Sequence, residues 1–176
     1  MDWYDSVFEV IDKRSFSNLW YWIGLAVLWS SVSHWVLGVP HDMILRARRE
    51  KTGPAMNDLH DLTRVNVNRI LYISEVSGSW ILLFASAILT ILGLTAFAYD
   101  VELSQAVFFL IAPLALLALM SVRTARRIRR DGDKDLMLIK RLGRHRFATQ
   151  LVGVFSIFVT AMFGMYKNLY VGPLGF

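Results

Sequence analysis

The sequence predicts an all-α polytopic membrane protein with four transmembrane helices, and three observations lead to that fold class. Apolar residues make up 55% of the chain and charged residues 19%, whereas soluble domains carry about 25% charged residues. Four stretches of 20 to 27 residues contain no Asp, Glu, Lys or Arg. The basic residues gather in two of the loops between these stretches.

The four uncharged stretches define the predicted spans, because a helix rises about 1.5 Å per residue and the hydrocarbon core is about 30 Å thick. Only a helix satisfies its own backbone polar groups in lipid. We therefore expect one membrane domain over residues 1–176, with transmembrane helices at residues 17–39, 76–99, 103–122 and 147–166. Cytoplasmic helices are expected at residues 41–75 and 123–146, and an outer tail at 167–176.

The N-terminal residues predict a short helix on the outer membrane surface. Trp3, Val7, Val10 and Ile11 share one helical face within residues 1–14, which is typical of a helix lying in the interface. The first residues are acidic where a signal peptide carries basic ones.

The placement of basic residues predicts the orientation of the chain. The first basic loop, residues 41–75, and the second basic loop, residues 123–146, together hold 16 of the 19 Lys and Arg residues. The turn between the second and third spans holds none. Because loops rich in Lys and Arg stay in the cytoplasm, we expect both basic loops inside and both termini outside.

The two basic loops resemble each other, which indicates either a tandem duplication of a two-span unit or a chance match between basic segments. In an ungapped frame shifted by 77 residues, six identical pairs align. These pairs are Arg46/Arg123, Arg49/Arg126, Asp58/Asp135, Leu59/Leu136, Arg64/Arg141 and Arg69/Arg146. A true duplication would relate the two units by an axis along the membrane normal.

A polar face inside the first predicted span is the main candidate for intramembrane chemistry. Ser30, Ser31 and His34 lie on roughly one side of a helix. An ionisable residue at membrane depth marks a candidate ion path, proton relay or ligand contact. In the structural alternative, the serines bond within the helix or to its neighbours and His34 reaches the inner interface.

The arginines of the basic loops are the candidate docking residues for anionic lipid headgroups or for an acidic soluble partner. They are Arg46, Arg48, Arg49, Arg64, Arg69, Arg126, Arg127, Arg129, Arg130, Arg141 and Arg146. Nothing beyond their charge favours nucleic acid as a partner.

Other chemistries lack the residues that they need. The chain has no cysteine, which excludes disulfides, thiolate metal sites and cysteine nucleophiles. No nucleophile elbow, phosphate-binding loop, dinucleotide motif or zinc-protease motif is present. The four histidines show no ligand spacing, so we expect no catalytic residues, no metal site and no cofactor.

Four short runs carry a family resemblance: RSFSNLWYW at residues 14–22, WSSVSHWVLGVP at 29–40, VNR at 67–69 and SEVSG at 74–78. They resemble a small family of bacterial inner-membrane proteins described as a component of the SufBCD iron–sulfur assembly complex. The resemblance implies a bacterial inner-membrane protein associated with that assembly system, so that the termini expected outside would be periplasmic. Without cysteine, a membrane partner or anchor fits better than a cluster carrier.

Together these patterns favour a non-enzymatic membrane scaffold or accessory subunit that engages anionic lipid and a cytoplasmic complex. The alternative is an oligomeric channel or transporter for ions or small solutes, built on the polar face of the first span. Four helices leave little room for a pore, so this alternative needs a homo-oligomer.

Overall fold

The computed structural model describes residues 15–170, and over this range the prediction of an all-helical fold is confirmed. The elements in chain order are η1 (Ser15–Ser17), α2 (Leu19–His34), β1 (Trp35–Val36), β2 (Val39–Pro40), α3 (His41–Glu50), α4 (Pro54–Val76), α5 (Gly78–Phe97), α6 (Glu102–Asp131) and α7 (Asp135–Tyr170). The surface helix predicted at residues 1–14 lies outside the described residues, as does most of the predicted tail.

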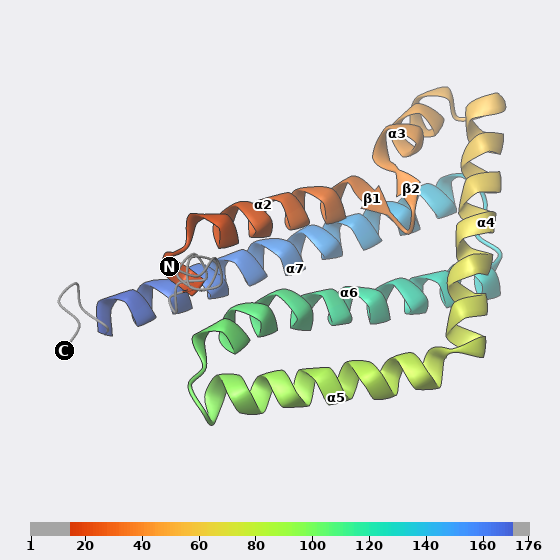
Figure 1. Cartoon of the computed structure of the whole chain (residues 1–176). Helices are drawn as coiled ribbons and strands as arrows, with labels where there is room; N and C mark the ends of the chain where they lie inside the picture. The colour runs from red at the N-terminus through yellow and green to blue at the C-terminus, as the bar shows by residue number, and fades with distance from the viewer. Residues whose placement is uncertain (1–14, 171–176) are drawn as a thin grey trace, which may run out of the picture.

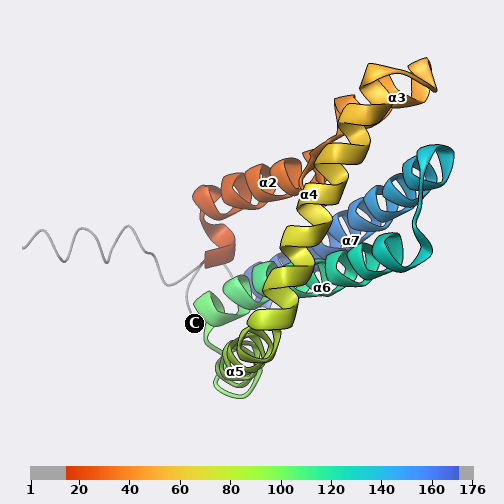
Figure 2. The same ribbon diagram turned by 90° about the vertical axis from the view of Figure 1, so that its right-hand side faces the viewer.

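Four helices run side by side in a row, in the order α5, α6, α7 and α2 (Figure 1). Helix α4 lies across the ends of this row, and Figure 2 shows it passing in front of the other helices. Helix α5 packs mainly on α6, and α2 packs mainly on α7. The two edges of the row, α5 and the outer side of α2, are therefore the least covered parts of the molecule.

Three of these helices are long and apolar enough to cross a membrane: α5, α6 and α7. Helix α5 lies within the second predicted span, and α6 and α7 contain the third and the fourth. Helix α6 has 30 residues and α7 has 36, so they rise about 45 and 54 Å. Both exceed the roughly 30 Å core of a bilayer, and their basic ends consequently extend beyond it.

The first predicted span, residues 17–39, is divided into η1, α2 and a short hairpin. Helix α2 has 16 residues, which gives a rise of about 24 Å. The hairpin turns at Leu37 (φ 53°) and Gly38 (φ 77°), the pair of positive φ angles that a tight two-residue hairpin turn requires. The structure thus shows three candidate spans, and a fourth is not confirmed.

The second basic loop forms no separate helix. Helix α6 continues to Asp131, a turn follows at Gly132 (φ 62°), and α7 starts at Asp135. Residues 123 and 146, the limits of the expected cytoplasmic helix, lie inside α6 and α7, which run through them without a break. The first basic loop instead contains two helices, α3 and α4.

The two proposed repeat units have different shapes. In the first unit the chain breaks at Ser77, and α4 lies across α5 (Figure 1). In the second unit α7 runs without a break through the matching positions. The residues at the break, Ser77 and Gly78, would match Val154 and Phe155. The duplication is not confirmed and stays a prediction.

The basic end of the molecule has its own apolar core. The hairpin, α3, α4 and the basic ends of α6 and α7 all contribute to it. Its fully buried members, with no exposed surface, are Val39, Ala47, Leu59, Ala125 and Leu142. Burying a large aliphatic side chain stabilises a fold by about 1.5–3 kcal/mol. The basic loops are therefore held in a folded unit rather than left as free segments.

Polar contacts tie the opposite end together. The Phe16 amide donates to Glu102 Oε1 over 2.8 Å, which fixes η1 on α6. Lys167 of α7 pairs with Asp100 in the turn between α5 and α6, and Gln105 Nε2 donates to the same carboxylate over 2.7 Å. These hydrogen bonds, that of Lys167 first, hold the pKa of Asp100 below its usual range.

Candidate functional sites

Seven of the eleven candidate docking arginines already have partners within the chain. Their contacts are Arg46–Asp58 (3.9 Å), Arg64–Asp61 (3.0 Å), Arg126–Ser74 (3.1 Å), Arg129–Glu75 (2.5 Å), Arg130–Asp131 (2.8 Å), Arg141–Asp131 (2.9 Å) and Arg146–His41 (2.5 Å). A paired arginine offers less to an external anion than a free one, since its internal partner must first be displaced.

Some of these contacts hold the basic end together, so their arginines do not offer their charge to an external partner. Arg141 pairs with both Asp131 and Asp133, so it holds the turn between α6 and α7. The Asp133 side chain is only 4% exposed. Arg126 and Arg129 contact Ser74 and Glu75, and they thereby attach the end of α4 to α6.

Four candidates remain exposed and make no ion pair within residues 15–170: Arg48 and Arg49 of α3, Arg69 of α4, and Arg127 of α6. Arg123, Lys140 and Arg144 share both properties but were not among the sequence candidates. Arg123/Arg127 and Lys140/Arg144 are each four residues apart on one helix, so each pair shares a face. That spacing is the sequence signal that could have added these residues to the docking candidates.

Arg146 and His41 join α7 to the start of α3. Arginine has only donors, so His41 Nε2 accepts the bond from Arg146 and the His41 proton lies on Nδ1. Burial lowers the pKa of His41, and the charges of Arg146 and His34 lower it further. The Asp42 carboxylate acts in the opposite direction and raises this pKa. His41 Nδ1 and Arg146 Nε are both buried without a hydrogen-bond partner.

A second histidine lies between α6 and α7. His145 is 7% exposed, and its ring nitrogens lie 3.1 Å from Thr124 Oγ1 and 3.4 Å from Ser121 Oγ. Both hydroxyls donate to backbone carbonyls of α6, which leaves their lone pairs for the imidazole. Because a neutral imidazole has one N–H donor and one acceptor nitrogen, these lone pairs satisfy only the N–H, and the other ring nitrogen accepts a hydrogen bond only when one hydroxyl turns its proton from the carbonyl to the ring.

The predicted polar face of Ser30, Ser31 and His34 lies on the outer side of α2. All three residues are exposed, whereas Leu25 and Trp29 on the opposite side are buried against α6 and α7. The fold does bring the three together, as expected from their spacing. However, they line no path within one chain.

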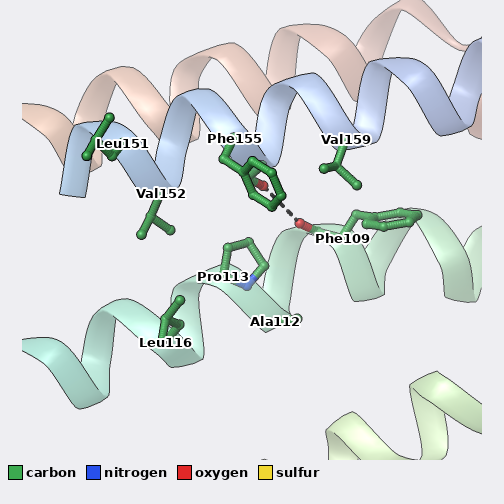
Figure 3. A pocket seen from close by; sticks show the side chains of 9 residues that line it. Phe109, Ala112, Pro113, Leu116, Leu151, Val152, Phe155 and Val159 are labelled. Carbon is green, nitrogen blue, oxygen red and sulfur yellow. Dashed lines mark hydrogen bonds between the residues drawn. The ribbon is translucent and has the colours of Figure 1, made fainter. Parts of the chain in front are cut away.

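An open groove of about 480 Å³ lies between α6 and α7, and its lining is apolar except for Ser156 (Figure 3). Pro113 has no amide N–H, so it leaves the Phe109 carbonyl without its helical partner. Ser156 of α7 donates to this carbonyl over 3.4 Å. Sequence reasoning missed this groove, although a proline inside a predicted span was its signal.

A smaller cavity of about 370 Å³ separates α4 from the turn between α6 and α7. His60 closes one side, where its Nε2 accepts a hydrogen bond from the Asp135 amide over 3.2 Å. The buried Thr63 hydroxyl has no partner there. The charged residues that line the cavity include both signs, Asp61 and Asp133 as well as Arg64, Arg129 and Lys134, so its charge selects no ligand class.

Within residues 15–170, no group of three or more His, Cys, Asp or Glu side chains could hold a metal ion. Comparison with protein-family models, curated proteins and solved structures gives no match.

Proposed function

We propose that this protein is a non-enzymatic membrane scaffold or accessory subunit whose basic end binds anionic lipid headgroups and an acidic cytoplasmic complex. One observation carries the proposal: the folded basic end presents exposed arginines that make no ion pair within residues 15–170, among them the sequence candidates Arg48, Arg49, Arg69 and Arg127. Unpaired arginines near a membrane surface attract anionic lipids, by about 1 kcal/mol each. The same groups suit carboxylates of a docked protein.

In this proposal α2 is a fourth membrane helix and the basic end lies in the cytoplasm. Helix α2 runs beside α7 over most of its length (Figure 1). The hairpin after it can lie at membrane depth, because Val36, Leu37 and Val39 are buried in protein and irregular backbone is tolerated there. The 16 basic residues of the two loops favour the cytoplasmic side.

The resemblance to the family associated with SufBCD points to an iron–sulfur assembly complex as the docked partner. In this role the protein would anchor the complex at the bacterial inner membrane, with both termini in the periplasm. The lack of cysteine supports an anchor over a cluster carrier, because thiolates are the usual cluster ligands.

The test is purification in mild detergent, with mass spectrometry of the bound proteins and lipids. We expect a stoichiometric acidic soluble complex with the wild-type chain. Simultaneous reversal of Arg48, Arg49, Arg69 and Arg127 to Glu should release it, while Arg→Lys at the same four positions should retain most of it. Equal recovery by the Glu and Lys variants would contradict the proposal.

The second candidate, an oligomeric channel, depends on the exposed polar face of α2. Because Ser30, Ser31 and His34 face outward, a conduit could form only between chains. Purified protein in proteoliposomes should then conduct ions, and His34→Ala should change that flux. No flux across a broad panel of ions would remove this candidate.

A further inference from the structure

Helix α2 has two sides of opposite character at the edge of the helix row. Its inner side packs Leu25 and Trp29 on α6 and α7, and a Cβ on Gly153 of α7 would come within 2.8 Å of the Trp29 ring. This close approach fixes the rotation of α2. The outer side is consequently determined as well, and it carries Gly24, Val27, Ser30, Ser31 and His34.

The outer side leaves hydrogen-bonding groups without partners. Within residues 15–170 the Ser30 and Ser31 hydroxyls make no hydrogen bond, and the His34 ring lies edge-on to the Trp35 ring. Several other hydroxyls in the spans bond to their own helix, as Thr95 does to Ile91 and Thr160 to Ser156. Lipid chains offer no donors or acceptors, so three polar groups on one lipid-facing side favour a protein neighbour.

We propose that this neighbour is a second copy of the chain, packed with its α2 parallel to the first across a two-fold axis. Such a contact places like residues opposite each other, and this suits hydroxyls because each can both donate and accept. Neutral imidazole has the same dual capacity. The inference rests on the proposed function only in that α2 lies in the membrane.

The shape of the outer side fits a close helix contact. Gly24 has open space where a Cβ would lie, and Ser31 follows seven residues later, two helical turns along the same side. Small residues at such positions allow two helix backbones to approach. Val27 lies between them, and its side chain is 60% exposed. The dimer would join the two rows of helices at their α2 edges.

Cross-linking can test this contact directly, because the chain has no cysteine. Single Gly24→Cys and Ser31→Cys variants of the full chain would be purified and placed in vesicles of phosphatidylethanolamine and phosphatidylglycerol at a low protein-to-lipid ratio. Mild oxidation should give disulfide-linked dimers of both. Thr90→Cys on α5 is the matched control, since the exposed Thr90 hydroxyl also makes no hydrogen bond within residues 15–170 but has no histidine beside it.

The labelling pattern separates failure of this inference from failure of the proposed span. If Ser31→Cys forms no more dimer than Thr90→Cys and resists a water-soluble maleimide, α2 lies in the membrane and the dimer is overturned. If it is labelled at the rate of an exposed site such as Lys51→Cys, the fourth span fails and the dimer with it. In native membranes, a cross-link from Ser31→Cys to another protein would also overturn the second copy.

A second measurement tests whether the polar side chains themselves stabilise the dimer. Fluorescently labelled chains in the same vesicles report the dimer fraction by energy transfer. Joint replacement of Ser30, Ser31 and His34 by Ala should weaken dimerisation by at least about tenfold, because each copy loses its interhelical hydrogen bonds. Thr90→Ala should leave it unchanged, and equal energy transfer by the triple variant and the wild type would contradict the proposal.

Discussion

The Ser156 hydroxyl of α7 donates a hydrogen bond to the carbonyl oxygen of Phe109 on α6, over 3.4 Å (Figure 3). That carbonyl is unpaired in its own helix because Pro113, four residues later, has no amide hydrogen. Pro113 therefore leaves the Phe109 carbonyl of α6 free, and the Ser156 hydroxyl of α7 forms a hydrogen bond with it. In lipid an unpaired carbonyl costs several kcal/mol, so this contact both repairs α6 and fixes its position on α7.

The first prediction follows from this pair. Ser156→Ala should lower the thermal stability of the detergent-solubilised protein, by about 1–2 kcal/mol, because the Phe109 carbonyl loses its donor. Pro113→Ala restores the helical N–H, so the same Ser156→Ala change should cost much less in that background. A double-mutant cycle measures this difference, and identical costs in both backgrounds would show that the hydrogen bond does not form.

The second prediction concerns the hairpin after α2. Gly38 has a φ of 77°, and a Cβ at this position would lie 2.8 Å from Asn66 Oδ1. Asn66 Nδ2 also donates to the Gly38 carbonyl over 3.3 Å. Gly38→Ala should destabilise the basic end by about 1–3 kcal/mol, measured by its thermal unfolding in detergent.

A paired variant separates backbone strain from the steric clash in the Gly38 replacement. In an Asn66→Ala background the clash disappears, but the positive φ remains. Gly38→Ala should then cost less than in the wild type, although still more than zero. Gly53 is a useful comparison, because its φ is also positive (102°) but open space surrounds it; Gly53→Ala should show strain alone.

The third prediction concerns the turn between α6 and α7. The Asp133 side chain is 4% exposed and pairs with Arg141. Arg141→Ala would leave this carboxylate buried without its cation, which costs about 3–5 kcal/mol in buried pairs. Asp133→Asn added to Arg141→Ala should recover part of the lost thermal stability. If the single Arg141→Ala variant is as stable as the wild type, Arg141 is free for docking after all.

The spans could be predicted from the sequence because a charge-free run is a local property. Residues 76–99, 103–122 and 147–166 lie within or closely overlap α5, α6 and α7 for that reason. The division of the first run was not predictable in the same way. Gly38 and Pro40 are local turn signals near its end, but the hydrogen bond from Asn66 to the Gly38 carbonyl joins residues 28 apart, and no local pattern encodes such a contact.

The candidate docking set shows the same limit. Composition and spacing identify basic residues, but they do not show which of them the fold uses internally. Arg141 and Arg127 look alike in the sequence, yet Arg141 pairs with two aspartates of the adjacent turn and Arg127 stays exposed. The contact between Arg146 and His41 spans 105 residues. Only the three-dimensional arrangement separates structural arginines from those available to a partner.

The last prediction is a pH dependence at the junction of α3 and α7. Burial, and then the Arg146 charge, lower the pKa of His41 in the folded protein. The unfolded chain consequently binds this proton more tightly, so protonation favours unfolding. The stability that neutral His41 contributes should be complete above the ordinary histidine pKa of about 6.5 and should be lost as the pH falls through the lowered value.

The charged neighbours of His41 sharpen the test. Protonated His41 would place a proton between its Nε2 and the Arg146 guanidinium, and the bond between them would break. Asp42 opposes this effect and His34 adds to it. Thermal stability in detergent should therefore fall more steeply between pH 7 and 5 in the wild type than in His41→Gln, which stays neutral. His34→Ala serves as the control, because His34 is exposed and should leave most of the slope in place. A slope that is unchanged in His41→Gln would assign the pH dependence to another group.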